Sequence, residues 1–250
     1  MKITDHLDTS LLSENSMEYI LILPSDCQRT LFWLHGYRER ARDLLQHPEF
    51  ERLAEQTHTA ILFPDVPDTY YLNQPWNHCY TEDFLVSEFI PAAAEKHHLP
   101  GDPQVTVLAG ISMGGFGSLL IGSHHPERFG RIACISGAFI IDDLLIGNPE
   151  ITGSAANAAH FQNLFGGIPS LAGDPARNPR LAAVNAQKEN LLPPVYLTCG
   201  TGDLLFERNR KLYRQLQLSG APVIWDDAEG GHEWGFFAPA VSRVMNWLTE

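Results

Sequence analysis

The sequence predicts an α/β protein in which a mostly parallel sheet lies between two layers of helices. Short, almost continuously apolar runs alternate with longer segments of helical character, and most of the short runs end beside Gly or Pro. Near-continuous apolar runs are typical of strands buried on both faces, as in a parallel sheet covered by helices. Regular alternation of such strands with helices gives a three-layer sandwich.

Seven apolar runs are predicted strands: residues 19–23, 30–34, 60–63, 105–109, 132–135, 195–198 and 222–225, the last nearer to an edge of the sheet. Five segments between them are predicted helices. Residues 81–98 are the clearest example, because Phe84, Leu85, Phe89 and Ala92 recur at helical spacing. The predicted helices are residues 48–58, 81–98, 113–125, 206–219 and 236–248.

Residues 139–192 differ from the rest of the chain. Gly, Asn and Pro turn signals are dense there, and only short helical pieces fit between them. We interpret this segment as an insertion that covers the strand ends, within a single domain spanning residues 1–250.

Composition excludes several classes of function. The chain has 17 Lys and Arg against 30 Asp and Glu, a net charge of −13, which argues against a nucleic-acid or anionic-membrane partner. No apolar run reaches the ~18 residues of a membrane span, and the N-terminus lacks the apolar core of a signal peptide. The 4 cysteines are widely spaced, and Cys134 and Cys199 lie in predicted strands, so we expect small buried thiols rather than metal or redox chemistry. A reduced, cytoplasmic protein is predicted, and a homo-oligomer is compatible with the sequence.

The segment Gly110-Ile111-Ser112-Met113-Gly114 matches Gly-x-Ser-x-Gly between a predicted strand and a predicted helix. In this context the motif predicts a strained strand-to-helix turn that exposes the serine oxygen at the end of the sheet. The glycines are needed because backbone segments approach closely on both sides of the serine. Ser112 is therefore the candidate nucleophile.

A serine nucleophile needs a base, and the base needs an acid to orient it. Asp203 follows the strand at 195–198, and His232 follows the last strand, so both lie where the chain order serine, acid, histidine requires. Asp174, Asp226 and Asp227 are alternative candidates for the acid, and Asp203 is favoured by position. Among the other histidines, His78 is a candidate to line the cleft, whereas those at 97–98 and 124–125 are interpreted as exposed residues at helix ends.

Developing negative charge on the substrate oxygen needs hydrogen-bond donors. The loop Leu34-His35-Gly36-Tyr37 follows a strand where this arrangement supplies one backbone N–H, and Met113, directly after the serine, supplies the second. We interpret His35 as a residue that holds this loop.

Together these motifs resemble the esterase branch of the α/β-hydrolase superfamily, which includes esterase D, S-formylglutathione hydrolase, tributyrin esterase and family 1 carbohydrate esterases. The resemblance covers nearly the whole chain. It is carried by Leu34-His35-Gly36, Trp76 with residues 80–85, residues 110–115, Cys199-Gly200-Thr201-Gly202-Asp203 and Gly231-His232-Glu233-Trp234. It implies the α/β-hydrolase fold, the triad Ser112, Asp203 and His232, and oxyanion donors at the N–H groups of Tyr37 and Met113.

The resemblance implies a serine carboxylesterase for short acyl groups, acetyl to butyryl, acting on a small-molecule ester. No metal or organic cofactor is expected, since no His-Glu-x-x-His, phosphate-loop or Gly-x-Gly-x-x-Gly motif is present. Ile111 stands where formylglutathione hydrolases have histidine, yet a thioesterase of that type stays open, as does a feruloyl or acetyl-sugar esterase. A catalytically silent binding protein and a serine peptidase are the weaker alternatives.

Aromatic residues are the candidates to line the substrate cleft. Trp76 and Trp234 are proposed from their positions near a strand end and the histidine, with packing in the core as the alternative. Phe139, Phe161 and Phe165 of the insertion are proposed to close the acyl pocket, again with core packing as the alternative.

Overall fold

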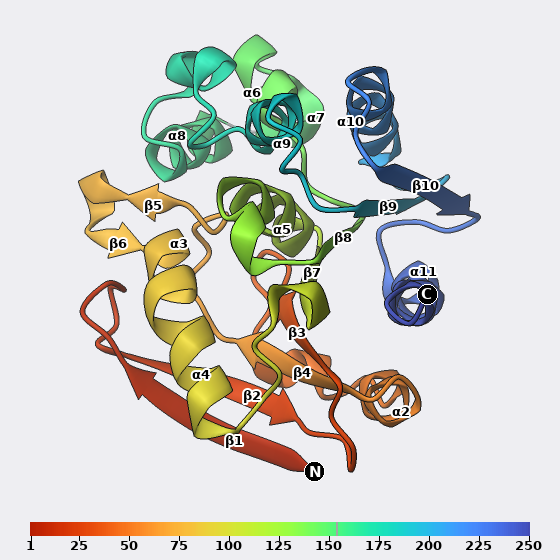
Figure 1. The fold of residues 1–250 in the computed structure, drawn as a ribbon. Coiled ribbons are helices and arrows are strands. Elements are labelled where there is room, and N and C mark those ends of the chain that lie inside the picture. The colour runs from red at the N-terminus through yellow and green to blue at the C-terminus, as the bar shows by residue number, and fades with distance from the viewer. Residues whose placement is uncertain (154) are drawn as a thin grey trace.

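All seven predicted strands form, as parts of an eight-stranded sheet (Figure 1). The computed structural model describes residues 1–153 and 155–250. The strand order is β1-β2-β4-β3-β7-β8-β9-β10. The bounds are β1 Lys2–Asp8, β2 Ser16–Ile22, β3 Arg29–Leu34, β4 Thr59–Pro64, β7 Thr106–Ile111, β8 Arg131–Ile135, β9 Val195–Gly200 and β10 Val223–Ala228.

The strands from β4 to β10 in this order are parallel, and β2 runs antiparallel to both of its neighbours, β1 and β4. The predicted position of β10 is confirmed, because it forms one edge. The opposite edge, β1, was not predicted. Its residues alternate between exposed and half-buried and include few apolar side chains, so no continuous apolar run marks it. A separate two-stranded hairpin, β5 (Asn73–Gln74) with β6 (Cys79–Tyr80), was also missed.

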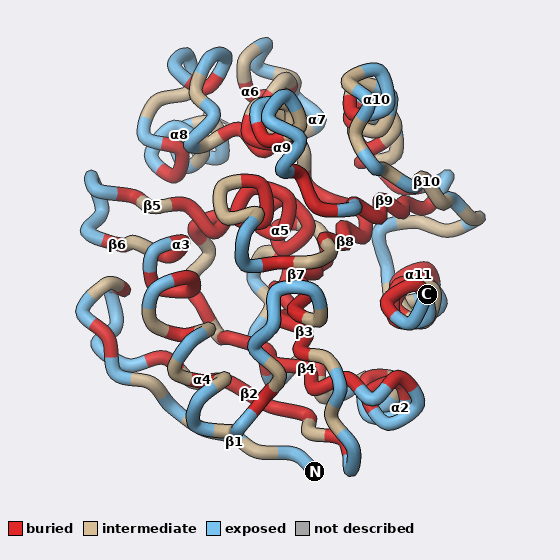
Figure 2. Tube along the Cα trace, in the orientation of Figure 1, coloured by how far each residue is buried: buried red, intermediate tan, exposed pale blue. Residues whose placement is uncertain are grey.

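Helices cover both faces of the sheet, which confirms the predicted α/β-hydrolase architecture. On one face, α2 (Glu49–Gln56) packs beside α11 (Trp234–Trp247). On the other lie α5 (Met113–His124), α9 (Pro179–Lys188), α10 (Phe206–Leu218) and the helical segment at 81–96 (Figure 1). Side chains alternate along β3 accordingly, and the central strands are buried throughout (Figure 2).

The predicted helix at 81–98 is helical with an interruption. It consists of α3 (Thr81–Asp83), a π-helical turn (Phe84–Phe89) and α4 (Ile90–Lys96). Ile90 N–H bonds to Leu85 O, five residues back. Pro91 has no N–H to donate to Ser87, which removes one ordinary α-helical bond at this point and favours the wider turn.

The turn-rich segment 139–192 contains only short helices, as expected. They are α6 (Ile141–Ile146), α7 (Pro149–Thr152), α8 (Ala155–Leu164), a 3₁₀ turn (Ile168–Gly173) and α9. Helix α9 packs against α5. Another short helix, α1 (Ala41–Leu44), follows β3.

The 4 cysteines are free thiols, and Cys134 and Cys199 are buried in β8 and β9 as predicted. In the described part of the chain, no helix is both long and apolar enough to span a bilayer.

Candidate active site

Three side chains from three strand ends meet at one edge of the sheet. Ser112 follows β7, Asp203 follows β9, and His232 lies between β10 and α11. The His232 Nε2 atom lies 3.1 Å from Ser112 Oγ, and His232 Nδ1 lies 2.8 Å from Asp203 Oδ2. The carboxyl ends of parallel strands meet at the same edge, so residues 29 and 120 positions apart in the chain become neighbours.

The serine sits on a strained turn. Ser112 has φ 55° and ψ −113°, a conformation that side-chain-bearing residues rarely adopt, and it precedes the first residue of α5. Glycine is required on both sides: a Cβ on Gly110 would lie 2.5 Å from the Leu34 carbonyl oxygen, and a Cβ on Gly114 would collide with the same carbonyl. The elbow therefore packs directly against the end of β3.

Asp203 is buried, with no side-chain surface exposed, and both of its oxygens accept hydrogen bonds. Oδ2 faces His232 Nδ1, and Oδ1 accepts the Leu205 backbone N–H at 2.8 Å. Burial by itself would raise the pKa of Asp203, but the hydrogen bonds from His232 and Leu205 outweigh it and lower the pKa. The carboxylate is thus held ionised beside the imidazole.

The three alternative acids are engaged elsewhere. Asp226 pairs with Arg243 at 2.6 Å. Asp227 accepts a bond from the indole of Trp225 at 2.9 Å, and Asp174 pairs with Arg177 within the insertion.

The loop after β3 lies against the serine. A Cβ built on Gly36 would be 3.7 Å from the Cβ of Ser112. Neither the Tyr37 N–H nor the Met113 N–H has a protein acceptor within residues 1–153 and 155–250. Met113 opens α5, where the helix dipole favours negative charge. Two backbone donors beside one serine form an arrangement that can receive an oxyanion.

The side chain of His35 holds this loop, as interpreted from the sequence. It is 1% exposed, and its ring nitrogens lie 2.8 Å from Gly36 O and 3.1 Å from Val66 O. The hydroxyl of buried Tyr71 donates to His35 O at 2.9 Å. Nothing in the sequence pattern marked this tyrosine.

The aromatic candidates lie in different surroundings. Trp76 is 39% exposed on the β5–β6 hairpin, and its indole N–H donates to Asn163 O of α8. Trp234 stacks on His47 with ring centroids 3.4 Å apart and packs edge-on against core residues Phe50 and Phe237. His78 is exposed at the turn of the same hairpin as Trp76.

All three insertion phenylalanines pack against the hydrophobic core, which was the alternative to a place in the acyl pocket. Phe165 is fully buried against Tyr70 and Phe116. Phe161 is half-buried on α8, and Phe139, also half-buried, lines a cavity whose lining does not include the serine. On the same helix as Phe161, exposed His160 bonds through Nε2 to the hydroxyl of Tyr37 at 2.9 Å, a contact that the sequence did not indicate.

The interpretation of the helix-end histidines as exposed residues was wrong for His97, His124 and His125. His97 is half-buried and bonds to the Tyr19 hydroxyl at 2.8 Å. His124 and His125 both contact the buried Glu82, at 2.7 and 3.0 Å.

Two members of this cluster, Glu82 and His124, have shifted pKa values. Burial would raise the pKa of Glu82, but the bonds from His124 and His125 outweigh it and lower the pKa. Burial would lower the pKa of His124, but Glu82 outweighs it and raises the pKa. His124 Nε2 also contacts Pro175 O, so the cluster joins α3, α5 and the insertion.

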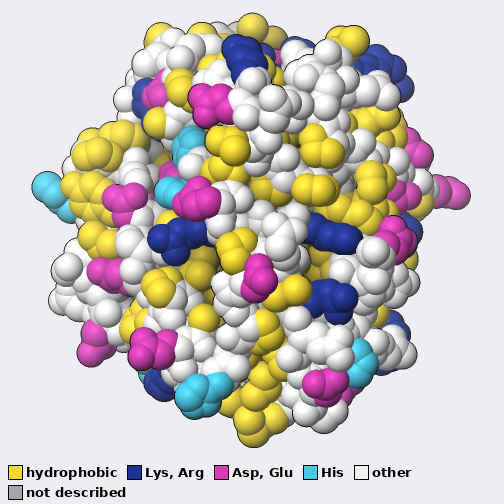
Figure 3. Space-filling model, viewed as in Figure 1, with side chains coloured by type: hydrophobic (Ala, Val, Ile, Leu, Met, Phe, Trp, Pro, Cys, Tyr) yellow, Lys and Arg dark blue, Asp and Glu magenta, His cyan; other side chains and the backbone are white. Residues whose placement is uncertain are grey.

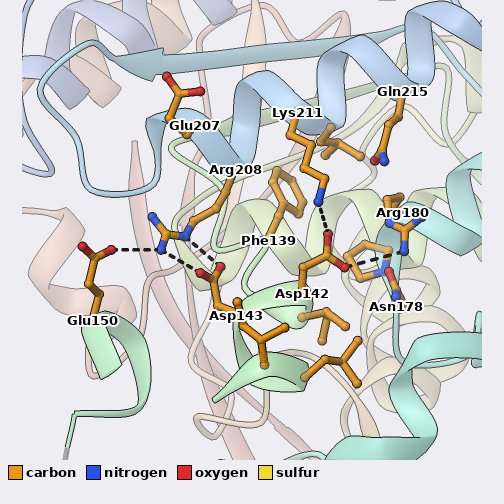
Figure 4. Close-up of a pocket in the computed structure, with 15 residues that line it drawn as sticks. Phe139, Asp142, Asp143, Glu150, Asn178, Arg180, Glu207, Arg208, Lys211 and Gln215 are labelled. Carbon is orange, nitrogen blue, oxygen red and sulfur yellow. Dashed lines mark hydrogen bonds and ion pairs between the residues drawn. The ribbon is translucent and has the colours of Figure 1, made fainter. Parts of the chain in front are cut away.

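A cavity of about 810 Å³ lies between α6, α9 and α10 and is lined by none of the three clustered residues (Figure 4). Its basic side chains pair with acidic ones of the same lining: Arg208 binds Asp143 through two bonds of 2.8 Å, and Lys211 binds Asp142 at 2.7 Å. Elsewhere, basic side chains lie scattered among acidic ones on the face shown in Figure 3. In the described residues, no three His, Cys, Asp or Glu side chains are grouped so that they could hold a metal ion.

Comparison with known proteins identifies the family. The family model described as "Putative esterase" matches residues 16–248, so the chain belongs to the Esterase family. An acetyl esterase from Caldicellulosiruptor saccharolyticus is 27% identical over 226 residues, covering 90% of this chain and 85% of the relative.

Solved structures share the fold. S-formylglutathione hydrolase (FrmB) from Staphylococcus aureus superposes with a TM-score of 0.83 at 20% identity over the full length of both chains. A fluorophosphonate-binding serine hydrolase of the same organism, FphF, gives a TM-score of 0.87 at 20% identity, covering 100% of this chain and 98% of that one. A ferulic acid esterase gives a TM-score of 0.77 at 20% identity, with the same coverage. The protein is thus a serine hydrolase of carboxylic esters with the α/β-hydrolase fold.

Proposed function

We propose that Ser112, His232 and Asp203 are the catalytic triad of a carboxylesterase for short acyl groups, acetyl to butyryl. Ser112 attacks the ester carbonyl while His232 Nε2 takes its proton, and Asp203 fixes the imidazole tautomer and stabilises its charge. The observation that carries this proposal is the pair of contacts, 3.1 Å and 2.8 Å, that joins the three side chains at the strained turn.

In the proposed cycle, the tetrahedral oxyanion is bound by the N–H groups of Tyr37 and Met113. His232 then protonates the leaving alcohol, and a water activated by the same imidazole releases the acid from the acyl-enzyme. Each backbone donor is expected to contribute ~2.7–4 kcal/mol of transition-state stabilisation. The two unpartnered N–H groups beside Ser112 support this assignment within the described chain.

Preference for short acyl groups is supported by the acetyl esterase relative and by α8, which reaches over the loop at Tyr37 through His160 and carries Phe161. A specific observation favours a feruloyl esterase as second candidate: Phe165 is buried in the core and Phe139 lines a cavity that includes none of the triad residues, an arrangement that would leave the cleft open for an aromatic acid. Four free thiols support a reducing compartment such as the cytoplasm.

The decisive experiment has two stages. A fluorophosphonate probe should label wild-type protein at Ser112 with unit stoichiometry, and absence of labelling would favour the catalytically silent binding protein instead. Values of kcat/KM for p-nitrophenyl acetate, butyrate and octanoate, with methyl ferulate and S-formylglutathione, then assign the substrate class. We expect a maximum between acetate and butyrate and a loss of tenfold or more at octanoate. A maximum at octanoate, or faster turnover of ferulate or the thioester than of butyrate, would contradict the short-acyl assignment.

Trp76 and Trp234 remain proposed cleft residues. A Trp234→Ala protein that folds normally and keeps the wild-type chain-length profile would remove Trp234 from the pocket, and its stacking on His47 would then be its role. The same measurement applies to Trp76→Ala, whose side chain contacts α8.

A further inference from the structure

The turn that contains Tyr37 is closed by a carboxylate from the same loop, that of Glu39. Glu39 N–H donates to Gly36 O at 3.2 Å, and Gly36 N–H donates to Glu39 Oε2 at 2.7 Å. This reciprocal pair spans four residues, like a capping box at a helix start. Gly36 leaves room for it, because a Cβ there would lie 2.7 Å from Glu39 Oε2.

A second carboxylate holds the other side of the same turn. Arg38 N–H donates to Asp68 Oδ1 at 2.9 Å, and Asp68 belongs to the loop after β4. Arg38 has φ 63°, a left-handed conformation that Gly or Asn usually supplies at this place in a turn. A strained residue of this kind persists only when its surroundings over-determine it.

The two carboxylates accept the amides on either side of Tyr37 and leave the Tyr37 N–H without an acceptor in the described chain. We infer that Glu39 and Asp68 are positioning residues, which fix the strained turn so that the Tyr37 N–H faces the substrate oxygen above Ser112. This inference rests on the proposed function, because it assigns the Tyr37 N–H to the oxyanion.

Loss of either carboxylate should act in the transition state rather than in substrate binding. Glu39→Ala and Asp68→Ala should each lower kcat roughly tenfold to a hundredfold, less than the 10²–10³ of a lost donor, with KM within about twofold. Inhibition constants of an aryl trifluoromethyl ketone, which forms an oxyanion on the serine, should rise by the same factor. Glu39→Gln keeps an acceptor oxygen and should retain kcat within about threefold.

The chain offers a matched control four residues further on. Arg40 N–H donates to Asp43 Oδ2 at 2.9 Å and Asp43 N–H donates to Arg40 O at 2.9 Å, the same reciprocal pair away from Ser112. Asp43→Ala should lower the unfolding temperature about as much as Glu39→Ala does and leave kcat unchanged. A merely structural role of Glu39 predicts equal effects on kcat in the two variants.

Relief of the backbone strain provides a second test. Adding Arg38→Asn to the Glu39→Ala variant should restore part of the lost kcat, because Asn adopts positive φ more readily than Arg. If Glu39→Ala loses much of its kcat and the double variant recovers none of it, the positioning role is overturned. It is also overturned if Glu39→Ala and Asp68→Ala both keep kcat within twofold of wild type. Fluorophosphonate labelling of wild-type Ser112 separates the two levels: labelled wild type with unaffected variants overturns this inference alone, whereas unlabelled wild type overturns the proposed function and this inference with it.

Discussion

Replacing Asp203 by Asn is the sharpest test of the triad, because the surroundings of this side chain restrict how the amide can sit. Asp203 Oδ1 accepts the Leu205 N–H and Oδ2 faces His232 Nδ1, each at 2.8 Å. An amide that keeps its oxygen on Leu205 turns its NH₂ toward Nδ1. The neutral ring then carries its proton on Nε2, facing Ser112, and cannot accept the serine proton.

The magnitude follows from the two amide orientations. The reversed amide would restore the productive tautomer but would bury two donors against each other at Leu205, which costs about 1–3 kcal/mol. That energy corresponds to a loss of roughly 5- to 150-fold, and the missing charge beside the imidazolium adds to it. A protein held in the wrong tautomer loses about 10⁴. We therefore expect Asp203→Asn to lower kcat between about 10² and 10⁴.

The assay is kcat with p-nitrophenyl acetate, beside thermal unfolding as a control for folding. Asp226→Asn is the matched variant, because Asp226 lies on the adjacent strand β10, opposite Thr198, but bonds to Arg243, Tyr196 and Thr198 instead of His232. It should stay within about threefold of wild type. A loss under tenfold in Asp203→Asn, or a larger loss in Asp226→Asn, would refute the assignment of the acid.

Three further predictions concern other parts of the site. Ser112→Ala should lose at least ~10⁴ in kcat, more than Asp203→Asn, and should lose fluorophosphonate labelling with an unchanged fold; a tenth of the activity left would contradict it. Glu82→Gln should destabilise the fold by on the order of 1 kcal/mol near pH 6, measured by urea unfolding. The lowered pKa of Glu82 contributes stability above its unfolded value of about 4.3, and the raised pKa of His124 contributes stability fully below about 6.5 that is lost as pH rises through the folded value. The difference from wild type should therefore shrink by pH 9, and a constant difference would contradict the linkage. Tyr37→Phe removes the bond to His160, worth about 1 kcal/mol, and should raise the octanoate-to-acetate ratio of kcat/KM a few-fold; His160→Ala should do the same, and strictly additive effects in the double variant would contradict a direct pair.

The sequence by itself determined seven of the eight strands of the main sheet and the chain order of the site. Strands buried on both faces need continuous apolar runs, so the central strands could be predicted from the local sequence alone. The glycines around Ser112 predicted the tight turn for a similar local reason, because only residues without a Cβ fit where the turn packs closely against β3.

The tertiary structure decided which strand forms the β1 edge of the sheet and which carboxylate pairs with His232. Strand β1 carries few apolar residues because it is half exposed, so nothing in its pattern marks it as part of the sheet. The choice of Asp203 over Asp226 was favoured by position along the chain, but only the folded chain brings a carboxylate to His232 and gives the other to Arg243.

The contacts of Tyr37 and Glu82 could not be predicted from the sequence, because they too depend on how separate elements pack. His160 meets Tyr37 across 123 residues, and His124 meets Glu82 across 42. A hydrogen bond of this kind leaves no periodic signal, because it depends on the directions of two side chains from separate elements and not on the local pattern of either. The sequence therefore determined most of the elements and the strands after which the reactive residues lie. The packing of those elements decided which polar groups hold the reactive residues in place.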